Sequence, residues 1–290
     1  MNQLSDVAYW AEAWKNDPHS PIKKMKKAGL ASPHSAGFIK WAEAFDANSF
    51  TAEATKRTER ILKWVEQYTG SLNGRTILDV GAASGVFSVP MAKAGAIVTA
   101  LEPTNILREK LVRNAPNHSV DVSIIGQSFE ELAVDQLPRY DLVFASMCPA
   151  MIDWDAVQKA IALSSKHVYI SLMAGPKKNS LVEELLNELK IEAPIQRTSD
   201  MMYVLQLLYL TGYSYQSLIE QHEKTMLMKR DDVLQQLHAW FLDYDVTLTD
   251  QQQRLAADLV KKKYNDDIPV ITGGRFGKVL ITKEQTSFPN

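Results

Sequence analysis

The chain has 290 residues, of which 46% are hydrophobic and 23% are charged, as is typical of a globular protein. Its formal net charge of −2 argues against a general nucleic-acid binder, which normally carries a surplus of basic residues. Cys148 is the one cysteine, so the chain cannot form an internal disulfide. No apolar run approaches the ~20 residues of a membrane span, and the amino terminus lacks the layout of a secretory signal. We therefore expect a cytoplasmic protein with no nucleic-acid partner and no membrane segment.

Residues 1–70 precede the first strand and are expected to form a helical cap. Trp10 and Trp14 are four residues apart and would share one helix face. Phe38, Trp41 and Phe45 recur at helical spacing, and residues 46–49 resemble a loop. Thr51 is placed to start a helix that runs to about residue 68.

The stretch 75–102 organises the rest of the chain. Residues 76–80 predict a buried parallel strand, and a turn of small residues follows at 81–85. A helix is expected over 86–94, with Gly95 as its stop, before a second strand that ends on Glu102. The spacing predicts one β-turn-α-β unit.

The backbone of this unit is suited to binding a ligand. The small residues let a ligand approach the main chain, and the turn directs free N–H groups into the crevice at the strand's carboxyl end. Glu102 is placed to accept hydrogen bonds from two ribose hydroxyls. A dinucleotide fold prefers G-x-G-x-x-G, whereas this turn has Ala83 between Gly81 and Gly85. Asp79 suits a ligand that carries a cation and suits a pyrophosphate poorly, so an NAD(P)-binding oxidoreductase is an alternative that this residue disfavours.

The run LDVGAASG, residues 78–85, resembles motif I of the class I S-adenosylmethionine (SAM) dependent methyltransferases, of the small-molecule type 11/12 kind. The resemblance implies a Rossmann-like α/β fold with a mostly parallel seven-stranded sheet, one antiparallel strand, helices on both faces and a helical N-terminal cap. It implies SAM as cofactor and S-adenosylhomocysteine (SAH) as product. The cofactor-binding residues that it implies in this region are Asp79, Gly81, Ala82, Ala83, Gly85, Glu102 and Pro103.

The resemblance also assigns the next two strand ends. A third strand at 120–125 leads to Gln127, Ser128 and Phe129, which would meet the adenine, although the family often has an Asp here. A fourth strand at 140–146 ends at Ser146 and Met147, which would line the floor of the site of methyl transfer. The sequence SMCPAM there does not match the Asn/Asp-Pro-Pro-Tyr/Phe motif of amino-methyltransferases of DNA and protein glutamine, which disfavours those substrates. Cys148 is interpreted as a small packed side chain.

The remaining elements complete the predicted core at 71–290. Asp153 is expected to cap a helix over 154–164, and Pro103 to open one that runs to residue 114. Further helices are expected at 180–189 and 200–211, and a helical insertion at about 230–265. Later strands are expected at 167–172, 217–228 and 279–282, with loops at 176–178 and 273–277.

We therefore predict a SAM-dependent methyltransferase for a small-molecule acceptor, monomeric or homodimeric. The candidates for substrate contact or a lid are Trp41, Phe45, Met151 and Tyr203. No His/Cys/Asp cluster has metal-ligand spacing, and no serine-hydrolase elbow or P-loop is present. The sequence identifies no catalytic base, with His34, Tyr203 and Tyr209 as candidates. A non-catalytic SAM-binding protein and the transfer of an aminopropyl or aminocarboxypropyl group remain alternatives.

Overall fold

A seven-stranded sheet organises the computed structural model, which describes residues 3–20, 24, 36–194 and 199–283. The sheet order is β3-β2-β1-β4-β5-β7-β6. β1 to β5 are parallel, and β7 is antiparallel to both of its neighbours, β5 and β6. The strands are β1 (Thr76–Val80), β2 (Ile97–Leu101), β3 (Ser123–Ile125), β4 (Tyr140–Ser146), β5 (Ser164–Asn179), β6 (Ser214–Lys229) and β7 (Asp267–Thr282). The expected sheet, with one antiparallel strand among parallel ones, is confirmed.

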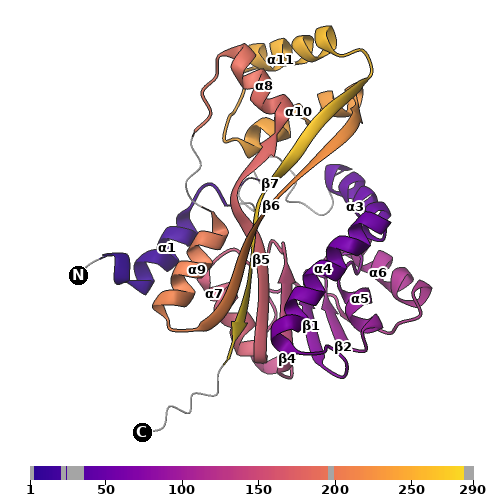
Figure 1. The fold of residues 1–290 in the computed structure, drawn as a ribbon, viewed down its shortest axis with the longest axis vertical. Coiled ribbons are helices and arrows are strands. Elements are labelled where there is room, and N and C mark those ends of the chain that lie inside the picture. Colours follow the sequence, from indigo (N-terminus) through magenta and orange to yellow (C-terminus); the bar gives the residue numbers. More distant parts are fainter. Residues whose placement is uncertain (1–2, 21–23, 25–35, 195–198, 284–290) are drawn as a thin grey trace.

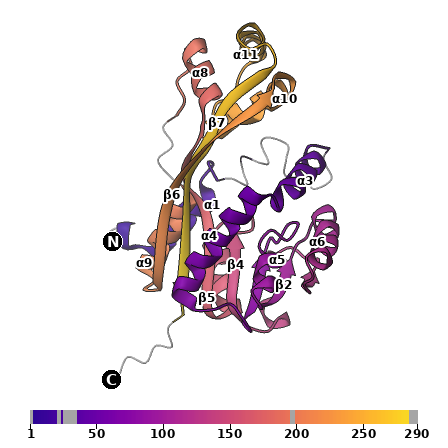
Figure 2. The same cartoon turned by 45° about the vertical axis from the view of Figure 1, so that its right-hand side comes forward.

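Helices cover both faces of this sheet (Figure 1 and Figure 2). One face, here called the α4 face, carries α4, α5 and α6, and the other, the α9 face, carries α1, α7 and α9. The helices are η1 (Gln3–Ser5), α1 (Val7–Asn16), α3 (Ala36–Ser49), α4 (Ala52–Thr69), α5 (Ser88–Lys93), α6 (Asn105–Asn117), η2 (Val134–Gln136), α7 (Trp154–Leu163), α8 (Ser180–Leu189), α9 (Asp200–Leu210), α10 (Arg230–Asp243) and α11 (Asp250–Lys263).

Side-chain caps fix several helix starts where the sequence predicted them. The Thr51 hydroxyl accepts the N–H of Ala54 at the start of α4. The Asp153 carboxylate accepts the N–H of Ala156 at 2.9 Å at the start of α7. α6 begins two residues later than expected, because Pro103 lies ahead of the N-cap Thr104 and outside the helix.

Three expectations about element length are wrong. Residues 46–49 are the last turn of α3 and not a loop. β5 continues through residues 176–178, with a register shift between Met173 and Lys177, and β7 begins at Asp267 and includes residues 273–277. The glycines and the proline of these two stretches were interpreted as signs of loops. In the structure, glycine in β7 allows a helix to pack closely against the strand. A Cβ at Gly277 would lie 2.3 Å from Met201 Cγ of α9.

The long strands β6 and β7 carry a second hydrophobic cluster beyond the core (Figure 1). We call this part the outer lobe: α8, α10, α11 and the adjoining ends of β6 and β7. Leu185 of α8, Phe241 of α10 and Val260 of α11 are buried in it against Val270 of β7. The domain boundaries expected from the sequence stay a prediction, and the structure adds α8 to the pair α10 and α11.

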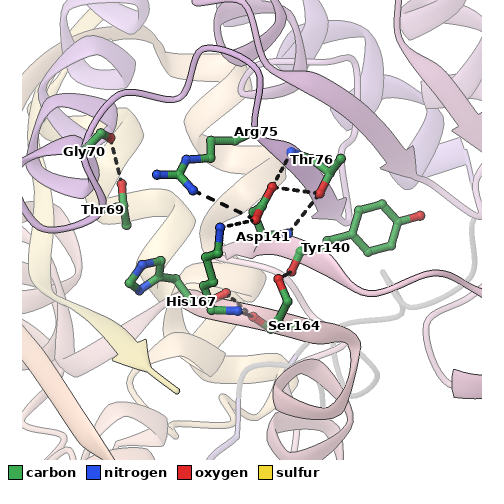
Figure 3. A network of polar contacts seen from close by, with 10 residues as sticks. Thr69, Gly70, Arg75, Thr76, Tyr140, Asp141, Ser164 and His167 are labelled. Atoms are coloured by element: carbon green, nitrogen blue, oxygen red, sulfur yellow. Dashed lines mark hydrogen bonds and ion pairs between the residues drawn. The ribbon is translucent and has the colours of Figure 1, made fainter. Parts of the chain in front are cut away.

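A polar network joins the amino ends of β1, β4 and β5 (Figure 3). The Asp141 carboxylate accepts the backbone N–H and the hydroxyl of Thr76, both at 3.1 Å. It lies 2.8 Å from the Lys166 ammonium and 4.0 Å from the Arg75 guanidinium. These contacts fasten β1 to β4 at the edge of the sheet opposite the motif I turn. In the part of the chain that the structure describes, no helix is both long enough and apolar enough to cross a membrane.

Candidate functional site

The turn after β1 lies at the carboxyl ends of β1 and β2, because its first N–H groups bond to the end of β2. The N–H groups of Gly81 and Ala82 both donate to the Leu101 carbonyl, at 2.9 and 3.1 Å. Gly81 has φ +72, and a Cβ there would lie 2.5 Å from the Cys148 sulfur, so only glycine lets β4 end this close. Ala83 has φ +50, a left-handed conformation that costs a residue with a Cβ.

Glu102 is fixed at the end of β2 by this turn. One carboxylate oxygen accepts the N–H of Ala83 and the other accepts the N–H of Thr104, each at 2.9 Å. The side chain is 4% exposed. A carboxylate has about four lone-pair positions, so two remain for further donors after these bonds. The paired hydroxyls of a ribose are donors of the right number and spacing.

Asp79 is the second buried acid of the site. Its carboxylate accepts the Ser88 hydroxyl at 2.5 Å, which joins β1 to the first turn of α5. Burial raises the pKa of Asp79 to about 7, opposed by the Ser88 hydrogen bond and assisted by the charge of Glu102. Among the described residues, neither Asp79 nor Glu102 makes an ion pair, so the pair is a buried anionic centre without a protein cation.

α3 is fastened beside the turn by a group of polar contacts that the sequence did not reveal. Asp46 lies 2.9 Å from the Arg113 guanidinium and 3.5 Å from the Lys110 ammonium of α6. The Asn114 amide donates to Asp46 at 2.8 Å and to the Ser84 carbonyl of the turn at 3.0 Å. A hydroxyl contact of 3.2 Å between Ser49 and Ser84 adds a second link. α3 is therefore positioned against the motif I turn.

The aromatic residues predicted as a lid lie on this helix. The Trp41 ring lies between those of Phe38 and Phe45, with centroid distances of 5.3 and 5.2 Å. Trp41 is 47% exposed, whereas Phe45 packs against the core cluster of the α4 face. Trp41 is the one of the two that has a free surface for a ligand.

The loop after β3 follows the sequence prediction in position but divides its residues. Gln127 is exposed, Ser128 is half-buried, and Phe129 is 3% exposed, with the Lys159 ammonium 5.0 Å from its ring centroid. Phe129 is thus a core residue whose ring is not open to an adenine. Arg108 donates to the carbonyls of Glu102 and Pro103, at 3.1 Å each, and so holds the loop that follows β2.

The carboxyl end of β4 and the middle of β5 beside it carry three hydroxyl groups. Ser146 and Ser171, whose oxygens are 3.0 Å apart, stand side by side in the sheet. The Met147 N–H donates to the Ser171 carbonyl at 2.9 Å and to its hydroxyl at 3.1 Å, and Met147 has φ +50 and is 45% exposed. Behind them lies the fully buried Tyr169 hydroxyl, which makes no hydrogen bond of ordinary geometry among the described residues, although Ser171 and Ser146 are close enough to offset part of the rise in its pKa that burial causes. Ser171 and Tyr169 were missed, because the sequence marked only the end of the fourth strand as functional.

Several predicted residues lie away from this edge. Met151 is 2% exposed in the core of the α9 face. Tyr203 lies beneath α1, where its hydroxyl donates to Asp17 at 3.0 Å and its ring stacks on Trp14. Tyr209 is 73% exposed on α9, and His34 is outside the described residues. The described residues supply no candidate base at the transfer site.

Cys148 is close to the turn but is not a reactive nucleophile. It is 5% exposed, and burial raises the pKa of its thiol to about 12, with the charges of Glu102 and Asp79 adding to the effect. The thiolate is therefore absent at neutral pH, and the thiol is a packed side chain. No group of His, Cys, Asp or Glu within the described ranges is arranged to hold a metal ion.

Comparisons with known proteins agree with this geometry. No family model matches the chain. A ubiquinone biosynthesis O-methyltransferase of Bordetella avium strain 197N is 32% identical over 170 residues, or 56% of this chain and 63% of that protein. A protein of the same name from Leptothrix cholodnii is 33% identical over 97 residues, or 32% of this chain and 38% of that protein. In these alignments the chain spans less than two thirds of the length of its curated relatives.

Solved structures show a similar fold. Magnesium protoporphyrin IX methyltransferase from Synechocystis PCC 6803, crystallised with bound SAH, matches 89% of this chain and 100% of its own, with a TM-score of 0.53 and 14% identity. The chain therefore has the Rossmann-like fold of the class I methyltransferases. The resemblance to class I SAM-dependent methyltransferases that the motif I turn indicated is confirmed.

Proposed function

We propose that the chain is a SAM-dependent O-methyltransferase that acts on a small hydroxylated acceptor. The observation that carries this proposal is the buried acidic pair, Asp79 and Glu102, at the carboxyl ends of β1 and β2. SAM has a sulfonium and an ammonium group, so it brings positive charge to two carboxyl groups that make no ion pair among the described residues. The names of the curated relatives support oxygen as the acceptor atom.

Each part of the cofactor has a matching group in this proposal. The free lone pairs of Glu102 take the ribose hydroxyls, and the backbone at Gly81 and Ala83 lines the amino-acid tail. Gln127 and Ser128 border the adenine, without Phe129. NAD⁺ fits this centre less well, because its pyrophosphate would lie near two buried carboxylates and like charges repel.

The transfer step needs orientation more than reactive side chains. SAM supplies an electrophilic methyl group, and proximity with alignment accounts for about 7–11 kcal/mol of a barrier. Ser146, Ser171 and the backbone of Met147 form a polar floor that can hold the acceptor oxygen, with Tyr169 behind it as a positioning residue. Trp41 on α3 excludes water from the cofactor side. A cytoplasmic location is proposed from the single, buried cysteine.

Calorimetric titration with SAM, SAH and NAD⁺ tests the cofactor. We expect binding of SAM and SAH only, and Glu102→Ala should weaken SAM by ~1.5–3 kcal/mol, which is the loss of a charged hydrogen bond. Glu109→Ala, at an exposed acid on α6, is the matched control and should leave the affinity unchanged. Equal affinities in the two variants would remove the ribose assignment.

Isotope position tests the group that is transferred. The protein is incubated with a mixture of small phenols, catechols and carboxylic acids and with SAM labelled either in its methyl group or in its carboxyl group. Transfer of the methyl label alone supports methylation, and transfer of the carboxyl label indicates an aminocarboxypropyl transferase. SAM binding without transfer to any acceptor, in the presence of cell extract, would favour a non-catalytic SAM-binding protein.

A further inference from the structure

β6 is an uncovered edge strand. It is the last strand of the sheet and pairs with β7 alone. Twelve of its sixteen residues are exposed and none is buried, whereas β7 beside it has eight buried residues. Figure 1 shows β6 and β7 running together from the core into the outer lobe. A long edge with free N–H and C=O groups is a template for another strand.

Four large apolar side chains are exposed along this edge. Leu227 is 69% exposed, Ile219 is 43% exposed, and Leu218 and Met226 are each 39% exposed. Of the usual devices that prevent edge pairing, the strand has charged side chains such as Glu223 and Lys224, but it has neither proline nor a bulge in its pairing with β7. The edge is therefore only partly protected against pairing with another strand.

A groove lies beside β6 on the α9 face. It has a volume of about 370 Å³ and is lined on one side by Tyr215 and Ile219 of β6 and on the other by Met202, Leu205 and Tyr209 of α9. Because side chains alternate along a strand, Tyr215, Ile219 and Leu227 all point to the α9 face. The groove is apolar and open, and Leu227 at the far end of the same strand is an apolar side chain without a pocket.

We propose that β6 pairs antiparallel with β6 of a second copy of this chain, with the two-fold axis at His222. This register places Ser217 opposite Leu227 of the second copy, so that Leu227 projects beside Tyr215 and Ile219 at the groove. It also places Glu220, which pairs with Lys278 within the chain, opposite Lys224, which pairs with Glu53, so opposite charges face each other on the α4 face. The contact is reciprocal, as an isologous interface requires.

Neighbouring registers fit less well. A shift of the axis to residue 220, 223 or 224 would bring Glu220, Glu223 or Lys224 opposite its own copy, which places like charges together. An axis at residue 221 would set Ile219 opposite Glu223 and Leu218 opposite Lys224, so two apolar side chains would meet charged ones. The axis at His222 matches Leu218 with Met226 and Ile219 with Thr225.

The helices at the two ends of β6 leave room for this pairing, whereas side chains of α4 contact its middle, where Arg60 lies 3.0 Å from His222 and Glu53 lies 2.7 Å from Lys224. Near the core end of β6, α9 lies on the α9 face, while Leu218 on the α4 face is exposed. Near the outer end the arrangement is reversed, because Met228 packs into the outer lobe on the α4 face and Leu227 on the α9 face is exposed. Antiparallel pairing brings the core end of β6 in one copy beside the outer end of β6 in the other. On each face of the sheet, the part of β6 that a helix or the outer lobe covers in one copy then lies beside an uncovered part in the other.

Light scattering after size exclusion tests the interface in the full chain. We expect twice the chain mass of 32.6 kDa. The double variant Ile219→Lys/Leu227→Lys should elute as a monomer, because two charged side chains per copy would enter the groove region, raising the dissociation constant by more than about tenfold. Leu255→Lys, at a leucine on α11 that is 51% exposed, is the matched control and should remain a dimer. A monomeric wild type, or a double variant that stays dimeric with an unchanged circular dichroism spectrum, overturns the proposal.

Engineered cysteines test the register. Opposed residues of antiparallel strands have Cα atoms about 4.5–5.5 Å apart, within the range of a disulfide. His222→Cys should give a disulfide-linked dimer on oxidation, and Thr225→Cys, whose opposite residue is Ile219, should not. Thr225→Cys combined with Ile219→Cys should form the link again. Cys148 is buried and does not compete. A crosslink in Thr225→Cys alone, or none in His222→Cys, overturns the register, and neither result depends on the proposed methyl transfer.

Discussion

The amino ends and the carboxyl ends of the parallel strands hold acidic residues in opposite surroundings. We call these two ends of the sheet the amino edge and the carboxyl edge, and neither is the edge strand β6. At the amino edge, Asp141 is 24% exposed and lies between Lys166 and Arg75, with Thr76 as hydrogen-bond donor (Figure 3). At the carboxyl edge, Asp79 and Glu102 are 2% and 4% exposed and bond only to uncharged donors. The strands β1, β2 and β4 therefore have a paired carboxylate at their amino ends and two buried carboxyl groups without an ion pair at their carboxyl ends.

The difference separates residues that stabilise the fold from residues that await a ligand. The hydrogen bond from Lys166 is the largest effect that lowers the pKa of Asp141, so folding favours its charge. Burial raises the pKa of Asp79, so folding opposes its charge. A buried charge without a partner costs free energy, and a protein keeps such a site where a ligand supplies the missing charge.

The largest effect is expected from Asp79→Asn. The folded-state pKa of about 7 lies above the ordinary value of 3.8, so the folded protein holds the proton more tightly than the unfolded chain. The contribution of Asp79 to stability therefore falls as pH rises from about 4 to about 7, by up to about 4 kcal/mol, and is constant above that. The variant lacks this loss, so denaturant unfolding of the ligand-free protein should show it gaining stability over the wild type between pH 4 and pH 8. The Asn carbonyl can still accept the Ser88 hydroxyl.

The same variant sharpens the argument about the ligand. A cationic ligand favours the charged form of Asp79, so SAM binding to the wild type near pH 6.5 should release protons. Calorimetry in two buffers of different ionisation enthalpy measures this release, and Asp79→Asn should abolish it and weaken binding. A variant whose unfolding free energy follows the wild-type pH profile would show that Asp79 is not the group concerned.

A smaller effect of opposite sign is expected from Asp141→Asn at the amino edge. The pKa of Asp141 is lowered, so its contribution is present at neutral pH and is lost as pH falls below about 4. The variant should lose about 1 kcal/mol at pH 7, since the ion pairs are partly exposed, and progressively less as the pH falls below about 4. Its SAM affinity should equal that of the wild type. Weaker SAM binding by Asp141→Asn would contradict the assignment of stability to the amino edge and of ligand binding to the carboxyl edge.

The sequence predicted the carboxyl edge better than the amino edge. A small-residue turn between two buried strands has few structural solutions, so the turn, its two strands and Glu102 followed from local pattern, whereas the rest of the sheet followed from the family resemblance. Asp141 gave no such signal, because its partners Thr76 and Lys166 are distant in the sequence and meet only when β1, β4 and β5 align.

Residues near the site were missed for the same reason. Asp46 holds α3 to α6 across more than sixty residues of sequence, and the short run that contains it resembled a loop. Tyr169 and Ser171 lie within the strand that was predicted at 167–172, but the sequence marked only the end of the fourth strand as functional, and the pairing of Ser171 with Ser146 appears only when β4 and β5 align. Phe129 and Tyr203 were assigned to ligand contact by analogy or composition, whereas burial places both in the core. Local pattern predicts elements, and side-chain roles depend on contacts between elements.

The smallest effect concerns backbone strain at the carboxyl edge. Ala83 has φ +50, and this left-handed conformation costs a residue with a Cβ about 1–2 kcal/mol. Glycine avoids that cost, but its unfolded chain has greater conformational entropy, which offsets part of the gain in stability. Ala83→Gly should therefore stabilise the protein by about 0.5–1 kcal/mol in denaturant unfolding. Its N–H still donates to Glu102, so SAM affinity should change little. At the amino edge, Gly74 has φ +73 and open space around it, so the reverse change Gly74→Ala should destabilise by a similar amount. A loss of stability in Ala83→Gly would mean that the methyl group of Ala83 has a packing role, and that strain is not a feature of this edge.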